Sequence, residues 1–262
     1  MCRMFGVKGS GLLAVKLQEA LIQAARRDAL DDNISHGDGW GGVWVSAFKL
    51  NYFRSGEPIF SSNDARDFFD SQVTQMAGLS HARKAAPNEP IRGAYDSHPF
   101  SAHLGDDLVF VTHNGWIDKH KLGLEGVDVS KINDTEAFCL LLEKLHSGGF
   151  TRTVENALTH VYDVGANIGA LNLFFLRVTR GGDTEVYYYS DYNEKMDAYY
   201  RLYEWHPNGG GSAIMSSTVA YIAGLININS ETLREDVKPA PKKELRRLAY
   251  LSSRNQLCVH PF

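Results

Sequence analysis

The order of strand-like and helix-like segments along the chain most constrains the fold. Runs rich in β-branched and aromatic residues favour strands. They occur at 2–7, 43–45, 78–83, 107–113, 170–178, 184–190 and 212–217. Apolar residues at helical spacing predict helices between them, at about 13 to 31–33, 63–73, 134–146 and 151–162. This order predicts an α+β fold in which two packed sheets are covered by helices.

A single domain spanning 1–262 is expected, because no repeat, low-complexity segment or long linker divides the chain. The part from about 238 is expected to form a basic helical extension. Its run KPAPKKELRR is interrupted by Pro and Glu, which favours a solvated face over an anion-binding patch. The aromatic-rich segment 187–205 is expected to cover the second sheet, with a lid or an acceptor-side wall as alternatives.

Composition argues against two classes of partner. The formal net charge of -4 offers no electrostatic basis for binding nucleic acid. No apolar stretch approaches the roughly 20 residues of a membrane-spanning helix, and the N-terminus lacks the apolar core of a signal peptide. Neither nucleic acid nor a membrane is therefore expected as a partner.

The three cysteines, Cys2, Cys139 and Cys258, are odd in number and widely spaced. Such spacing is a poor disulfide framework for a chain of this length and favours a reducing, cytoplasmic location. In that setting a single cysteine is either a small buried apolar residue or a nucleophile.

Cys2 follows the initiator methionine in MCRMFGV. Removal of Met1 would place a thiol and a free α-amine on the same residue, with reference pKa values of about 8.5 and about 7.7–8.0. The amine could then act as the base for the thiol, as it does for N-terminal threonine nucleophiles. An incidental or buried cysteine is the alternative.

Three further segments offer groups for acyl chemistry. In VFVTHNGW the side-chain amide of Asn114 and the N–H of Gly115 are candidate oxyanion donors, although Asn-Gly is also a common hairpin turn. Arg83 in SHARKAAPN could hold a carboxylate through two parallel hydrogen bonds. Asp134 in NDTEAF could bind an ammonium group or simply belong to a helix cap. Together these groups describe glutamine or another γ-glutamyl compound.

The chain resembles the class II glutamine amidotransferases, which are N-terminal nucleophile hydrolases with a four-layer αββα sandwich. The resemblance covers most of the first 140 residues. Six motifs in the order typical of the family carry it: MCRMFGV, HGDGWG, SHARKAAPN, SHPF, HNGW and NDTEAF.

The resemblance implies a role for each matching residue. Cys2 would be the nucleophile with its amine as base, and Asn114 with Gly115 the oxyanion hole. Arg83 and Asp134 would bind the glutamine head group. The remaining candidates for substrate binding are Gly39, Trp40 and His98; Gly39 and Trp40 would line the surroundings of the nucleophile. His98 has no assigned chemical role, and a buried, hydrogen-bonded core histidine is the favoured interpretation.

Two departures indicate the stand-alone type without a synthase domain. Fused members commonly carry Arg-Trp-Ala-Thr-His where this chain has RKAAP (83–87), and only 128 residues follow Asp134. The expected activity is release of ammonia and glutamate through a Cys2 γ-glutamyl thioester, and a separate synthase is a candidate partner that would accept the ammonia. The alternatives are a γ-glutamyl amide hydrolase acting on a metabolite and a non-catalytic glutamine-binding or synthase-docking module. No cofactor or metal is expected, because HExxH, CxxC and paired-ligand spacings are missing.

Overall fold

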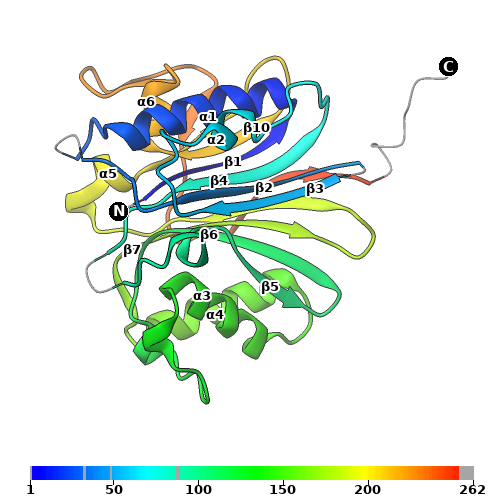
Figure 1. The fold of residues 1–262 in the computed structure, drawn as a ribbon, viewed down its shortest axis with the longest axis vertical. Coiled ribbons are helices and arrows are strands. Elements are labelled where there is room, and N and C mark those ends of the chain that lie inside the picture. The colour runs from blue at the N-terminus through cyan, green and yellow to red at the C-terminus, as the bar shows by residue number, and fades with distance from the viewer. Residues whose placement is uncertain (1, 32–33, 48, 87–88, 254–262) are drawn as a thin grey trace.

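Two antiparallel sheets pack face to face between two layers of helices in the computed structural model, which describes residues 2–31, 34–47, 49–86 and 89–253 (Figure 1). The seven-stranded sheet has the order β13 (Val237–Pro239), β9 (Leu202–Trp205), β10 (Ser212–Ser216), β1 (Arg3–Gly9), β4 (Met76–Ala82), β2 (Trp40–Ser46), β3 (Lys49–Ser55). The five-stranded sheet has the order β14 (Arg246–Leu251), β8 (Thr184–Tyr189), β7 (Asn167–Val178), β6 (Asp107–Ile117), β5 (Phe100–Leu104). A two-stranded ribbon joins β11 (Ile226–Asn227) to β12 (Thr232–Leu233).

The helices form the two outer layers, and the expected four-layer αββα sandwich is confirmed (Figure 1). The seven-stranded sheet is covered by α1 (Gly11–Arg26), α2 (Asn63–Asp67) and α6 (Ser217–Ile222), with α5 (Asp197–Tyr200) beside them. The five-stranded sheet is covered by α3 (Asp134–Leu145) and α4 (Phe150–Asp163). Short 3₁₀ turns lie at Gly93–Asp96, Lys119–Lys121, Val129–Lys131 and Glu194–Met196.

Apolar side chains fill three layers of core. Helix α1 begins after Ser10, whose hydroxyl accepts a hydrogen bond from Leu13 N, and it buries Leu17 and Leu21 against the seven-stranded sheet. Between the two sheets, Met4 and Phe110 belong to the central core. These layers pack β1 in one sheet across from β6 in the other. The packing therefore fixes the position of the N-terminal residues that precede β1.

The expected helical extension from about 238 is wrong. Val237–Pro239 is strand β13, and Arg246–Leu251 is strand β14, which pairs with the edge of β8. Pairing satisfies backbone groups that an open β8 edge would leave exposed. Arg247 also donates to Glu185 at 2.8 Å, so the basic run is accommodated by sheet pairing and ion pairs.

Other elements differ at their ends. The first helix ends at Arg26, short of the expected 31–33, of which 32 and 33 lie outside the described residues. Helix α2 ends at Asp67 and is therefore shorter than the expected range 63–73. The aromatic segment 187–205 starts in the five-stranded sheet and ends as β9 in the seven-stranded one, so it links the two sheets instead of covering one.

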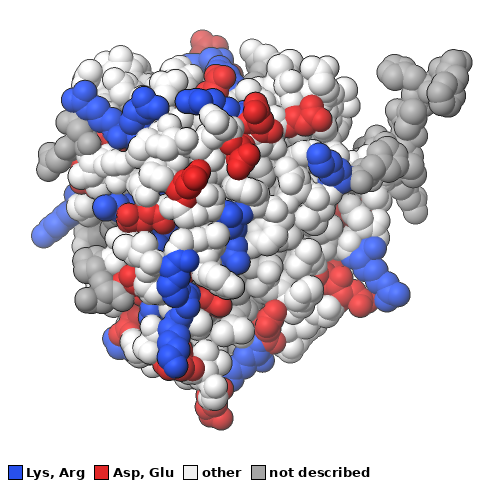
Figure 2. Space-filling view, in the orientation of Figure 1, with Lys and Arg blue, Asp and Glu red and all other residues white. Residues whose placement is uncertain are grey.

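Charged side chains of both signs are interspersed on the face shown in Figure 2. Within the described part of the chain, every helix is too short or too polar to cross a membrane.

Candidate active site

Cys2 lies immediately before β1, which is an inner strand of its sheet. Its side chain is 7% exposed and borders a small cavity. The Sγ atom is 3.4 Å from the backbone N of Lys84 and 3.5 Å from the carbonyl oxygen of the same residue. The thiol is therefore positioned by backbone groups just beyond the end of β4.

Arg3 connects this start of the chain to a buried charged cluster. Its Nη1 donates to the carbonyl oxygen of Cys2 at 3.4 Å, and its Nε lies 2.5 Å from Asp28 Oδ2. Asp28 also accepts hydrogen bonds from Thr218 and pairs with His36 Nε2 at 2.8 Å. Burial acts to raise the pKa of Asp28, but the hydrogen bonds and the Arg3 charge outweigh it and lower that pKa strongly. The charged carboxylate thus anchors the strand that carries the thiol.

Asn114 contacts the backbone of Cys2 from the opposite sheet. Cys2 N donates to Asn114 Oδ1 at 3.0 Å, and Asn114 is fully buried. Its Nδ2 makes no hydrogen bond to any residue that the structure describes. Strand β6 continues through Asn114 and Gly115 to Ile117, so the hairpin-turn alternative for this dipeptide is wrong. The amide donor remains available beside the thiol-bearing residue.

Gly115 is required by the packing of β6. A Cβ at this position would lie 2.0 Å from the carbonyl oxygen of Ala170 and 2.6 Å from His113 Nε2. No side chain fits so close to a backbone atom, and the glycine therefore lets β6 approach β7 where the cavity begins.

Arg83 supplies a buried positive charge to the cavity. It follows β4, is 2% exposed, and borders the same cavity as Cys2. Its Nη2 donates to the carbonyl oxygen of Pro90 at 2.8 Å, whereas Nη1 makes no hydrogen bond within the described residues. The guanidinium thus retains donor capacity for an anionic group.

Asp134 is the first residue of α3, and the N-cap is its neighbour Asn133, whose side chain accepts from Thr135 N. Asp134 Oδ2 accepts from Ile117 N at 3.1 Å. Burial acts to raise the pKa of Asp134, but His113 and the backbone N–H groups outweigh it and lower that pKa. A charged carboxylate therefore borders the cavity.

Two groups in the cavity lining were not expected from the sequence. His113 is 2% exposed, and its Nδ1 lies 3.5 Å from Asp134 Oδ2. Glu89 pairs with Lys119 at 2.9 Å, and both side chains are 7% exposed. Burial and the charge of Asp134 raise the pKa of Glu89. The position of His113 next to Asn114 was an available signal, whereas nothing in the sequence connects Glu89 to Lys119.

His98, Gly39 and Trp40 are placed differently from one another. His98 borders the cavity, but its Nε2 is bound to Thr135 Oγ1 at 2.8 Å, and burial lowers its pKa well below the usual range. Gly39 pairs through its backbone with Arg83 N at 2.8 Å. Trp40 packs in the apolar core against aromatic rings, outside the cavity lining. Only His98 of these three reaches the cavity.

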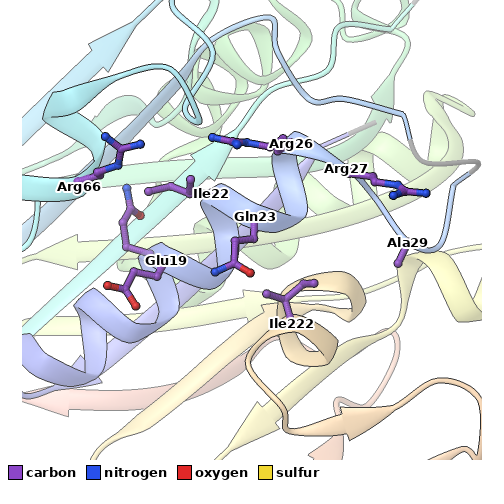
Figure 3. A pocket seen from close by; sticks show the side chains of 9 residues that line it. Glu19, Ile22, Gln23, Arg26, Arg27, Ala29, Arg66 and Ile222 are labelled. Carbon is purple, nitrogen blue, oxygen red and sulfur yellow. The ribbon is translucent and has the colours of Figure 1, made fainter.

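The cavity has a volume of about 20 Å³, which holds roughly one water molecule, so an amino-acid ligand would have to widen it. A larger hollow of about 690 Å³ lies along the outer face of α1, between Arg66 and Ile222 (Figure 3). Its lining contains no cysteine, serine, threonine or histidine. Of these two cavities, the smaller one is therefore the one that a candidate nucleophile borders. No group of three potential metal ligands occurs within the described residues.

A family model and several known proteins resemble this chain. Residues 1–196 match the family model described as "Glutamine amidotransferases class-II". A curated relative, "Putative glutamine amidotransferase YafJ" of Escherichia coli strain K12, is 29% identical over 113 residues, which are 42% of this chain and 43% of that protein.

Solved structures share the fold. Glutamine phosphoribosylpyrophosphate amidotransferase from B. subtilis has 16% identity and a TM-score of 0.57 over 94% of this chain and 48% of its own. An allosteric regulatory enzyme of purine biosynthesis has 17% identity and a TM-score of 0.58, with the same two coverages. The chain thus spans about half the length of these proteins.

Proposed function

Because the chain belongs to the class II glutamine amidotransferases, we propose that it hydrolyses the side-chain amide of glutamine with Cys2 as nucleophile. One observation carries this proposal: the Cys2 thiol, the Arg83 guanidinium and the Asp134 carboxylate border the same cavity. These three residues are far apart in the sequence, at positions 2, 83 and 134. An incidental cysteine at position 2 would have no reason to lie beside a buried guanidinium and a buried carboxylate.

The head-group end of the cavity suits a zwitterion. Among its lining residues Arg83 and Lys84 are positive, whereas Asp134 and Glu89 are negative. Glu89 is paired with Lys119, and Lys84 Nζ lies 3.8 Å from Asp38 Oδ2. The charges left are one buried cation, Arg83, and one buried anion, Asp134. An α-carboxylate on Arg83 and an α-ammonium on Asp134 would pair with both.

The reaction begins once Met1 is removed and the α-amine of Cys2 is free. The amine takes the thiol proton, and the thiolate attacks the side-chain carbonyl carbon. The tetrahedral oxyanion is stabilised by Asn114 Nδ2, the buried donor without a partner among the described residues, and by Gly115 N–H. The intermediate expels ammonia, protonated by the amine, and leaves a γ-glutamyl thioester. Water, deprotonated by the same amine, then releases glutamate and restores the thiol.

Intact-mass analysis with a glutamine-like diazo-ketone tests this proposal. The wild-type protein should lose one methionine and gain one adduct, mapped to the N-terminal peptide, and glutamine should be hydrolysed to equal amounts of ammonia and glutamate. The Cys2→Ser variant should remain unlabelled and should lose at least 100-fold in kcat.

Cys139→Ala is the matched control. Burial raises the pKa of the Cys139 thiol, to which Glu143 and Glu136 add, so this thiol stays protonated and unreactive. Its replacement should leave labelling and turnover unchanged. A retained Met1 in the purified protein, or an adduct on another peptide, would contradict the proposal. Parallel turnover of γ-glutamyl amides then tests whether ammonia or a larger amine is the preferred leaving group.

A further inference from the structure

Arg3 is the charged residue nearest in sequence to the proposed nucleophile, and the proposed reaction assigns it no task. Its side chain is fully buried. A guanidinium is costly to bury unless its charge and its donors are matched. Asp28, which is also fully buried, matches the charge, because its Oδ2 lies 2.5 Å from Arg3 Nε. The remaining donors of Arg3 then determine which other groups the pair holds.

The Nη1 atom of Arg3 contacts two carbonyl oxygens from distant parts of the chain. One belongs to Cys2, 3.4 Å away, and the other to Tyr199, 3.3 Å away. Each terminal nitrogen of a guanidinium carries two hydrogens, so Nη1 can donate to both oxygens at once. The guanidinium also lies over the Tyr199 ring, 3.8 Å from its centroid. Arg3 thus connects Cys2 to helix α5, which belongs to the aromatic segment 187–205.

The carbonyl group of Cys2 lies just outside the sheet, because strand β1 starts at Arg3. Once Met1 is removed, Cys2 is a chain end, and chain ends fray unless they are tied down. Its nitrogen donates to Asn114 Oδ1, and its Sγ lies beside the backbone of Lys84. The hydrogen bond from Arg3 holds the carbonyl oxygen, so each of the three polar groups of Cys2 has its own partner.

We propose that Arg3 is a positioning residue, which holds the carbonyl of Cys2 so that the freed α-amine and the thiol stay aimed at the cavity. This inference rests on the proposed function. A peptide plane contains the preceding Cα atom, so a fixed carbonyl also fixes the point from which the amine and the thiol extend. Asp28 orients the guanidinium and is itself held by Thr218 Oγ1, which donates to it at 2.6 Å.

Two variants remove the contact to Cys2 without leaving a buried charge unpaired. In Arg3→Lys the ammonium group can still pair with Asp28, but its single nitrogen cannot also reach both carbonyl oxygens. Arg3→Met/Asp28→Asn removes both charges together. Arg177→Lys is the matched control. Arg177 also bridges two groups, the carboxylates of Asp107 and Glu185, but it lies outside the cavity lining.

Both Arg3 variants of the mature protein should lose roughly 10² in kcat for glutamine, the cost of misplacing a reacting group by about 1 Å. KM should stay within about threefold of wild type, because Arg83 and Asp134 are untouched. Arg177→Lys should keep both constants within threefold. The diazo-ketone should show the same division, with a slower labelling step at unchanged affinity. A kcat within threefold of wild type in Arg3→Lys, or an equal loss in Arg177→Lys, would overturn the proposal.

A reaction that needs no glutamine separates this inference from the hydrolase proposal. The reagent 2-cyanobenzothiazole condenses with the thiol and the amine of an N-terminal cysteine, and both are reached only when the chain end leaves its contacts. Protein prepared with Cys2 as its first residue should react about tenfold or more faster as Arg3→Lys than as wild type, the equivalent of one lost hydrogen bond to a charged group. This result supports the positioning role even if the wild type proves inactive. Equal rates overturn it even if the wild type hydrolyses glutamine.

Discussion

Replacing Asn114 by Asp tests the oxyanion donor without removing the contact to Cys2. The substitution exchanges Nδ2, which has no hydrogen-bond partner among the residues that the structure describes, for an oxygen that accepts. It keeps an oxygen at the Oδ1 position, 3.0 Å from Cys2 N. The site loses one donor and gains negative charge where the oxyanion would form. Asn114→Ala removes the donor and the Cys2 contact together.

Loss of one preorganised oxyanion donor costs about 2.7–4 kcal/mol of transition-state stabilisation, or roughly 10²–10³ in kcat. Asn114→Asp should show at least this loss at pH 8, with KM for glutamine changed less than fivefold. Asn114→Ala should lose a similar factor in kcat and an additional ~1 kcal/mol of unfolding free energy for the lost hydrogen bond. Ammonia release and urea unfolding measure the two effects.

Asn172→Asp is the matched control. Asn172 pairs with Asn114 across the strands, but its Nδ2 is already bound to the carbonyl oxygen of Tyr200 at 2.8 Å. If this neighbouring carboxylate lowers kcat as much as Asn114→Asp does, added charge explains the loss and the donor argument fails. An Asn114→Asp enzyme with kcat within threefold of wild type would refute the oxyanion assignment directly.

Three further outcomes are expected. Gly115→Ala should reduce turnover and destabilise the fold by about 1–3 kcal/mol in urea unfolding, because its Cβ would lie 2.0 Å from Ala170 O; unchanged stability would contradict this packing. Lys119→Met should cost about 3–5 kcal/mol by leaving Glu89 buried and unpaired, and adding Glu89→Gln should recover most of it. Burial lowers the pKa of His81 from 6.5 to about 3, so acid favours the unfolded state, in which this histidine binds a proton first. His81 should therefore cost about 2.3 kcal/mol of stability between pH 6.5 and 4.5, and His81→Asn should abolish that part of the pH dependence.

The layered fold could be predicted because it depends on local periodicity. Leu17 and Leu21 recur at helical spacing, and the segment 170–178 is apolar enough to be recognised as a buried strand. The C-terminal strand β14 could not be predicted in this way, since its pairing partner β8 lies about 60 residues earlier. In the sequence alone, the basic residues at 246 and 247 favour a solvated helix. Their acidic partners lie on neighbouring strands, which only the folded structure shows.

In the candidate site, too, some residues could be predicted from local sequence and others could not. Asn114 and Asp134 stand out in short motifs, and their placement near Cys2 follows from the order of the strands. Glu89 and Lys119 carry no local signal, because their pairing exists only after β6 and α3 have packed.

The hydrogen bond from Cys2 N to Asn114 Oδ1 joins residues 112 positions apart, and this separation sets an order of events during synthesis. At about 5–20 residues per second, the ribosome needs roughly 6–20 s to add residue 114 after the N-terminus is made. A methionine-removing peptidase therefore meets an unshielded end before β6 exists. Protein that is made without this trimming and treated with the peptidase only after folding should keep its methionine, and rapid trimming of the folded form would contradict this timing.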